Sequence, residues 1–369
     1  MKKILISVVL LVVAGLGIWK VYTPHPGPLP QGERGKPAVK IGVTQSLTGN
    51  MAVFGESMQK GISMAIDEIN SNPDNVFIYE VVFEDDAMMP NRAATNVQKF
   101  IHYNKVNAIF TAFSGPANAV NSIVEQNKIP AIHRVYSDST TRGRYNFQNT
   151  ITVAGIGNGF IKFIKKRNMK NIAVFSIQDE ATLSVMDYIV KNLADTDIKI
   201  EKYITLPTER DFKTIVNKIK VQNSDLIVIL GFAPAPEILS KELLIQNVLS
   251  TIIGMEIYNN TPELPKILKD FYSLGVTDGS PEFVKKYGGR TYFAQHAYDN
   301  VYIVAKVFES LGKKNGGRIP SSDEVVDEIH KIKKFTGVVG DMVVDESGQF
   351  HSEPVLYHVV NGKAVMVEE

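Results

Sequence analysis

The sequence predicts an α/β fold in two lobes, each built on a parallel sheet, with a three-segment hinge between them. Three observations predict it. Strands and amphipathic helices alternate along most of the chain after residue 39, which is typical of parallel sheets with right-handed crossovers. At least seven such units follow one another, more than one small core holds. A long helix and then short β segments end the chain, as expected if it returns between lobes.

The first unit spans residues 39–70. Its apolar residues alternate at first and then recur at helical spacing, which predicts a strand, a loop and a helix. These residues are Val39, Ile41 and Val43, then Met58, Ile62, Ile66 and Ile69. Gly49 and Gly55 give the backbone of the loop between the two elements additional conformational freedom. Open α/β sheets bind ligands where a strand's carboxyl end enters a helix, because backbone N–H groups converge there.

Further strands are expected at intervals, with helical stretches between nearly all of them. Their ranges are 76–84, 106–112, 129–133, 171–176, 198–204, 225–230 and 251–254. The 369 residues, 44% hydrophobic and 21% charged, are enough for two substantial cores. The stretch 150–159 is a suitable place for the chain to cross to the other lobe.

The C-terminal region contains one long helix and a hairpin. Residues 294–312 carry an apolar stripe that includes Val301, Val304 and Phe308. Strands are expected at 338–344 and 354–367, with Asn361-Gly362 as a two-residue hairpin turn. We therefore expect one lobe to hold residues 39–152 and 274–336, and the other to hold 153–273 and 337–369.

The N-terminus predicts export. Lys2 and Lys3 precede the uncharged run 4–19, the pattern of a signal peptide or a signal anchor within residues 1–20. Because no A-x-A cleavage site follows and Trp19, Lys20 and Tyr22 are typical of a membrane interface, a retained anchor is favoured. Residues 21–38 are rich in Pro and Gly and predict a linker. The expected location is the periplasm or the outer face of the cytoplasmic membrane.

Composition excludes several classes of function. Lys plus Arg number 40 and Asp plus Glu 39, so no basic footprint for nucleic acid exists. The absence of cysteine excludes disulfides, thiolate metal sites and a lipid-modified cysteine anchor. Common hydrolase, metalloprotease and P-loop motifs are absent, and Gly155, Gly157 and Gly159 have the wrong spacing for a dinucleotide loop. We therefore expect that the chain is not an enzyme and that it has no catalytic residue and no cofactor.

Two loops carry candidate chemistry. The acidic run 84–86 follows a strand and could bind a hard cation, but a solvated turn or helix cap is the favoured interpretation, and no metal site is predicted. Ser114 and the N–H of Gly115 follow a second strand and precede a helix, which predicts a carboxylate pocket. The polar loop 134–140 ends the next strand and is expected beside it.

From about residue 39 to residue 367 the chain resembles type I periplasmic solute-binding proteins, and in pattern the leucine/isoleucine/valine-binding proteins of branched-chain amino-acid ABC transporters. The motifs that carry the resemblance are 39–70, 84–87, 141–143, 211–213, 297–299 and 345–348, in family order. The resemblance implies two Rossmann-like lobes of the periplasmic-binding-protein-like I fold. It also implies an interlobe cleft for the ligand.

The resemblance also implies site residues. Ser114, Gly115, Ser137 and the backbone at Val135 would hold the ligand's carboxylate. Glu256 would pair with an α-ammonium, although an ordinary surface acid is the alternative. Two aromatic residues, Phe54 and Phe232, would flank the ligand's side chain.

The sequence departs from the family at two places. Residues 181–182 stand where the family has Tyr-Gly, and His133-Arg134 replace a small residue and proline. Arg134 would add positive charge at the cleft, so a ligand other than leucine is left open.

These inferences predict an extracytoplasmic protein that binds a small ligand, expected to be an amino acid, and delivers it to an ABC permease. Its N-terminal segment would contact the membrane, and no nucleic acid would bind. The alternative is a ligand-sensing ectodomain or regulator of the same fold that signals to a separate chain.

Overall fold

The computed structural model describes residues 35–136, 143–261 and 263–367. Contacts divide the chain into residues 1–35 and residues 36–369, and both sheets belong to the second unit. The predicted signal or anchor at 1–20 and nearly all of the linker at 21–38 lie outside the described residues. No helix within the described ranges is both long enough and apolar enough to cross a membrane.

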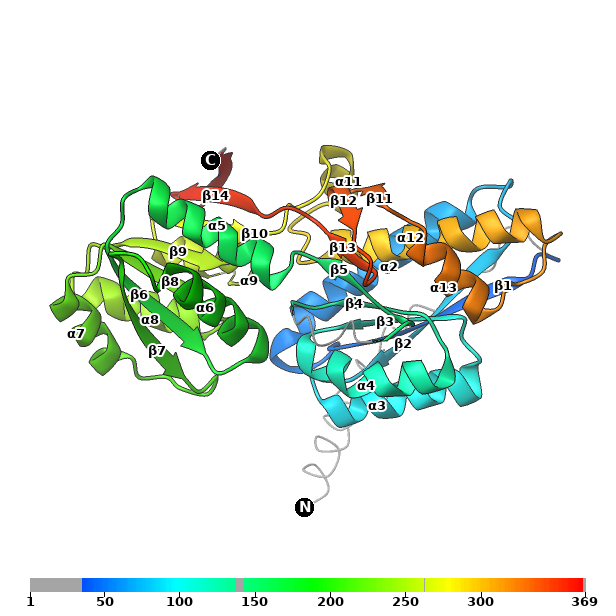
Figure 1. Cartoon of the computed structure of the whole chain (residues 1–369), viewed down its shortest axis with the longest axis horizontal. Helices are drawn as coiled ribbons and strands as arrows, with labels where there is room; N and C mark the ends of the chain where they lie inside the picture. Colours follow the sequence, from blue (N-terminus) through cyan, green and yellow to red (C-terminus); the bar gives the residue numbers. More distant parts are fainter. Residues whose placement is uncertain (1–34, 137–142, 262, 368–369) are drawn as a thin grey trace, which may run out of the picture. The chain divides into compact units, whose positions relative to one another are not determined.

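The first sheet has eight strands in the order β11-β12-β13-β5-β4-β3-β1-β2 (Figure 1). They are β1 (Ala38–Gln45), β2 (Ile78–Asp85), β3 (Ala108–Ala112), β4 (Ala131–Arg134), β5 (Asn146–Thr150), β11 (Lys334–Gly337), β12 (Gly340–Val344) and β13 (Gln349–His351). The strands from β2 to β13 pair in parallel, whereas β12 and β11 continue the sheet in antiparallel pairing.

The second sheet has seven strands in the order β15-β14-β10-β9-β8-β6-β7. They are β6 (Asn171–Ile177), β7 (Lys199–Thr205), β8 (Leu226–Leu230), β9 (Thr251–Met255), β10 (Asp270–Gly275), β14 (Val355–Val360) and β15 (Lys363–Val367). Strands β6 to β10 are parallel, and β14 and β15 form the predicted hairpin. Asn361 and Gly362 both have positive φ, as a two-residue hairpin turn requires.

Helices cover both faces of each sheet (Figure 1). The helices on the side of the first sheet are η1 (Gly49–Met51), α2 (Ala52–Asn70), α3 (Pro90–Lys99), η2 (Phe100–Asn104), α4 (Ser114–Asn127), α11 (Pro281–Tyr287), α12 (Ala294–Lys314) and α13 (Ser322–His330). The helices on the side of the second sheet are α5 (Val153–Lys166), α6 (Glu180–Leu193), α7 (Lys213–Gln222), α8 (Ala235–Ile245), α9 (Ile257–Asn260) and α10 (Leu264–Ile267).

Strand β8 shows why the chain folds into layers. Leu226, Val228 and Leu230 pack in one hydrophobic core with α5 and α6, while Ile227 and Ile229 pack in a second core with α7 and α8. Successive side chains of a strand point to opposite faces, so a strand covered on both faces is apolar throughout. All five side chains are fully buried.

The structure confirms the predicted α/β class and the two lobes, with one correction to their boundaries. The chain passes between the sheets three times, after β5, after β10 and after β13. We expected residues 337–369 in the second lobe, but β12 and β13 pair in the first sheet, so that expectation is wrong for 340–351. The sheets are also mixed instead of wholly parallel. Strands β5, β10, β11 and β13 were not predicted. Among them, β5, β11 and β13 are short and largely polar, so they carry little apolar signal.

The second connection between the sheets leads to α12, which holds the turn between β11 and β12. Asp299 of α12 is 1% exposed and accepts hydrogen bonds from Val338 N–H at 2.9 Å and Val339 N–H at 3.1 Å. A Cβ at Gly337 would lie 2.3 Å from the Asp299 carboxylate, so that glycine allows the close approach. Burial raises the pKa of Asp299 to about 7. The hydrogen bonds from the two N–H groups act in the opposite direction but are the smaller effect.

Asp299 predicts a pH-dependent stability. Because its folded pKa lies above the unfolded value, the native state binds the extra proton, and stability falls as pH rises from about 4 to about 7. Relative to Asp299→Asn, which does not titrate, the wild type is expected to be more stable at pH 4 than at pH 8 by on the order of 4 kcal/mol. Urea unfolding of both proteins across this range measures the difference. A difference independent of pH would contradict the raised pKa.

Candidate functional site

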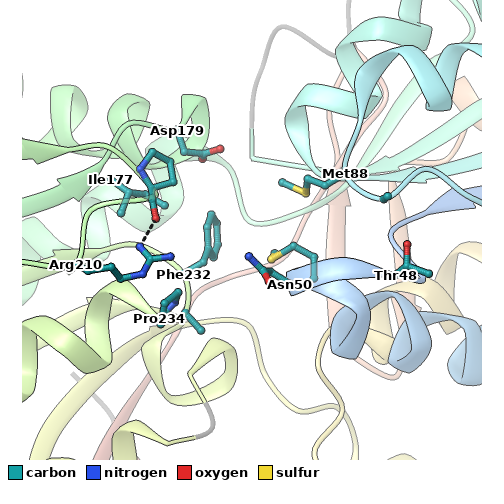
Figure 2. A pocket seen from close by; sticks show the side chains of 12 residues that line it. Thr48, Asn50, Met88, Ile177, Asp179, Arg210, Phe232 and Pro234 are labelled. Carbon is teal, nitrogen blue, oxygen red and sulfur yellow. Dashed lines mark hydrogen bonds between the residues drawn. The ribbon is translucent and has the colours of Figure 1, made fainter.

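Loops from both sheets line a cavity of about 280 Å³. They follow the carboxyl ends of β1, β2, β6, β7 and β8, the position at which open α/β sheets bind ligands. Figure 2 shows Thr48, Asn50 and Met88 facing Ile177, Asp179, Arg210, Phe232 and Pro234 across this cavity. The remaining lining residues are Met51, Ala87, Pro207 and Ala233.

The first-sheet wall of the cavity is held by two carboxylates. Asp85 accepts hydrogen bonds from the N–H groups of Leu47 and Thr48 and from the Thr48 hydroxyl, at 2.8, 3.2 and 2.6 Å. Asp86 accepts from the Thr44 and Ser46 hydroxyls, both at 3.1 Å. The acidic run thus organises loops, and the described residues contain no group of three ligands suited to a metal ion.

The second-sheet wall presents one carboxylate, one guanidinium cation and one aromatic ring. Asp179 caps α6 by accepting hydrogen bonds from the N–H groups of Ala181 and Thr182. Burial raises the pKa of Asp179 above its usual range despite these bonds. Arg210 donates to the Pro207 carbonyl oxygen at 2.8 Å, the dashed line in Figure 2. Phe232 lies at the centre of this wall.

A smaller recess of about 20 Å³ adjoins the cavity, because Met88, Asp179 and Phe232 line both. Its other lining residues are Phe113, Ser114, Arg134, Val135, Tyr136 and Ala181. Ser114 begins α4, so the positive end of that helix faces the recess, as predicted for a carboxylate pocket. The loop after β3 is joined to the end of β4 by a hydrogen bond from Phe113 N–H to the Arg134 carbonyl.

Behind the recess, Arg134 of the first sheet forms an ion pair with Glu256 of the second. One guanidinium nitrogen donates to both carboxylate oxygens, at 3.1 and 3.3 Å, and the side chains are only 6% and 0% exposed. The guanidinium carbon also lies 3.4 Å from the centre of the Phe293 ring. Burial and the Glu256 charge raise the pKa of Tyr136 well above its usual range.

The described architecture agrees with a comparison of the sequence with protein families. Residues 38–241, more than half of the chain, match the family model described as periplasmic binding protein. The chain belongs to the periplasmic binding protein family. Members of this family bind solutes and do not convert them, which confirms that the chain is not an enzyme.

Relatives of this periplasmic binding protein cover nearly its whole length. A Leu/Ile/Val-binding protein homolog from Brucella melitensis is 21% identical over 89% of this chain and 94% of its own. A Leu/Ile/Val-binding protein from Rhizobium johnstonii is 22% identical over the same shares of both chains.

Solved structures of the same fold hold different ligands. A leucine-binding protein from Thermotoga maritima has a TM-score of 0.79 at 19% identity, over 89% of this chain and 98% of its own. A substrate-binding protein from Streptococcus pneumoniae in complex with isoleucine has a TM-score of 0.78 at 22% identity, covering 90% and 100%. A solute-binding protein from R. palustris in complex with 4-hydroxybenzoate has a TM-score of 0.78 at 20% identity, covering 90% and 96%.

The binding protein brings together only some of the residues predicted for its site. Ser114 and Val135 line the recess, and Phe232 lines both the recess and the cavity. Gly115 is exposed in the first turn of α4. Ser137 lies outside the described residues.

Two predicted residues are placed differently from the expectation. Phe54 is 2% exposed and stacks on Phe293 at 5.5 Å between ring centres, so it belongs to the core and lines neither hollow. Glu256 is not a surface acid, since its carboxylate is buried and paired with Arg134.

Other lining residues were missed, although a signal for them exists in the sequence. Met88, Asp179 and Arg210 stand in loops that follow predicted strands, as Ser114 does. Open α/β sheets bind ligands in the loops that follow the carboxyl ends of their strands, and this rule, applied to every predicted strand, indicates these loops. Neither hydrophobic pattern nor motif distinguishes their individual side chains.

Proposed function

We propose that the chain is an extracytoplasmic solute-binding protein of an ABC-type transporter. It binds one small ligand between the two sheets and delivers it to a membrane permease. The observation that carries the proposal is the cavity of about 280 Å³, lined by strand-end loops of both sheets. Its volume is close to the lower end of the range of about 300–1,000 Å³ for small-molecule sites. Residues 1–20 would export the chain and contact the membrane.

The mechanism follows from the two walls. A ligand that contacts both walls stabilises the arrangement in which they face each other, in proportion to the contacts made there and nowhere else. Thr48 and Asn50 supply polar groups on one wall, and Arg210 and Phe232 supply a cation and an aromatic face on the other. A permease could then distinguish loaded from empty protein.

The finer prediction, a branched-chain amino acid, is a proposal supported by the names of the relatives from Brucella melitensis and Rhizobium johnstonii. The likeness to a protein solved with 4-hydroxybenzoate supports an aromatic acid equally well. Both ligands carry a carboxylate, for which the N-terminus of α4 with Ser114 is suited. They differ in the α-ammonium group, which needs an available acid.

A thermal-shift screen of the purified chain tests the proposal. Amino acids, aromatic and aliphatic acids, amides, sugars and nucleosides are added one at a time. A ligand of the native state must raise the Tm, by about 5 °C at a concentration about 100 times its Kd. Phe232→Ala is expected to reduce that rise, whereas Tyr103→Ala, at an 80% exposed residue away from the cavity, leaves it unchanged.

Uptake separates transport from sensing. Cells that lack the chain should take up the identified solute more slowly, and the wild type but not Phe232→Ala should restore uptake. Unchanged uptake with intact binding would favour the sensory alternative. No shift with any compound would overturn the proposed function itself.

A further inference from the structure

The acid that the family resemblance assigns to a ligand's ammonium group is already neutralised inside the protein. Both Glu256 carboxylate oxygens accept from Arg134, and the Glu256 side chain has no exposed surface. Arg134 is held in turn by the Phe293 ring at 3.4 Å and by the Tyr136 hydroxyl at 3.4 Å. An ammonium group could reach Glu256 only by displacing a buried guanidinium, which would then lose its counter-charge.

The same arginine lines the recess and carries an unused hydrogen-bond donor. Arg134 lines it together with Ser114, and the buried Arg134 Nε–H has no hydrogen-bond partner among the described residues. A buried donor without a partner is costly, and an anion in the recess would relieve that cost. The α4 N-terminus faces the same recess, since Phe113 and Ser114 line it.

We propose that Arg134 is the specificity-determining residue of the site. By neutralising Glu256 and donating toward the recess, it selects a small carboxylic acid that lacks an α-ammonium group. The inference rests on the proposed solute-binding function and names its class of ligand. The carboxylate lies in the recess at Ser114, and the apolar body extends between Met88 and Phe232 into the larger cavity.

Asp179 is the competing residue for an ammonium group. It lines both hollows, but its Oδ1 already accepts from two N–H groups of α6. Leucine binding that is lost in Asp179→Asn would therefore assign the ammonium to Asp179 and overturn the proposal.

Matched ligand pairs on the full-length chain test the inference. The pairs are leucine with 4-methylpentanoate and phenylalanine with 3-phenylpropanoate, which differ only by the α-ammonium. The acid of at least one pair is expected to raise the Tm of the wild type by about 5 °C at about 100 times its Kd, and its amino acid to bind at least about tenfold more weakly. Preference for the amino acids would overturn the inference.

Variants of the ion pair give the second readout. Arg134→Ala removes the counter-charge of Glu256, so preference is expected to move toward the amino acids. Arg134→Met/Glu256→Gln, which leaves no buried charge and keeps the side-chain volumes, should bind the acids weakly and show no preference for amino acids. An unchanged preference in this double variant would contradict the role of Arg134. Shifts by sugars, amides or nucleosides alone would refute the ligand class and leave the solute-binding function standing.

Discussion

Glu256→Ala is expected to lower the free energy of unfolding by about 3–5 kcal/mol. The substitution removes the counter-charge of Arg134, whose side chain is 6% exposed and cannot regain water without movement of the surrounding residues. The pair joins β4 of the first sheet to the end of β9 in the second, so the loss falls on contacts between the sheets. Urea unfolding at pH 7, followed by circular dichroism, measures it.

The matched control is Arg134→Met/Glu256→Gln. Replacing a buried ion pair by uncharged groups of similar volume is often neutral or even stabilising, because two charges no longer need to be desolvated. We expect the double variant to unfold within about 1.5 kcal/mol of the wild type. A loss below about 1 kcal/mol for Glu256→Ala would show that Arg134 finds another partner or reaches water.

Gly55→Ala is the second substitution with a large expected effect. A Cβ at Gly55 would lie 1.8 Å from the Ser46 carbonyl oxygen, a distance at which α2 or the loop after β1 must move. That loop is tied down, because Gln45 donates to the Gly55 carbonyl at 2.8 Å and Leu47 donates to Asp85. A strained or overpacked contact of this kind costs about 1–3 kcal/mol, and occasionally more.

Gly115→Ala is the control for Gly55→Ala. It also places a methyl group in the first turn of a helix, but the nearest heavy atom would be 3.7 Å away, an ordinary contact. Alanine should therefore be neutral or stabilise by up to about 1 kcal/mol. Because Thr48 and Asn50 line the cavity, Gly55→Ala should also weaken ligand binding. Equal stability of the two variants would contradict the close approach.

The candidate site was predictable in part. Ser114 and Val135 line the recess. Their loops could be located from the sequence, because a loop between a strand and a helix is recognisable from local pattern and its place at a sheet edge follows from parallel pairing. Phe54 was predicted to flank the ligand's side chain, and the structure places it in the core. An aromatic residue in the first turn of an amphipathic helix faces either the cleft or the core, and the packing of Phe293 against it decided for the core.

The sequence by itself determined the fold class, the positions of the early strands and the C-terminal hairpin, because each depends on apolar periodicity or on turn residues close together in the chain. Tertiary structure alone decided that β12 and β13 join the first sheet and that Arg134 neutralises Glu256, residues 122 positions apart. Periodicity reports which side of an element is buried. It does not report which distant charge will lie beside it, and that neighbour determines whether a buried acid is available to a ligand.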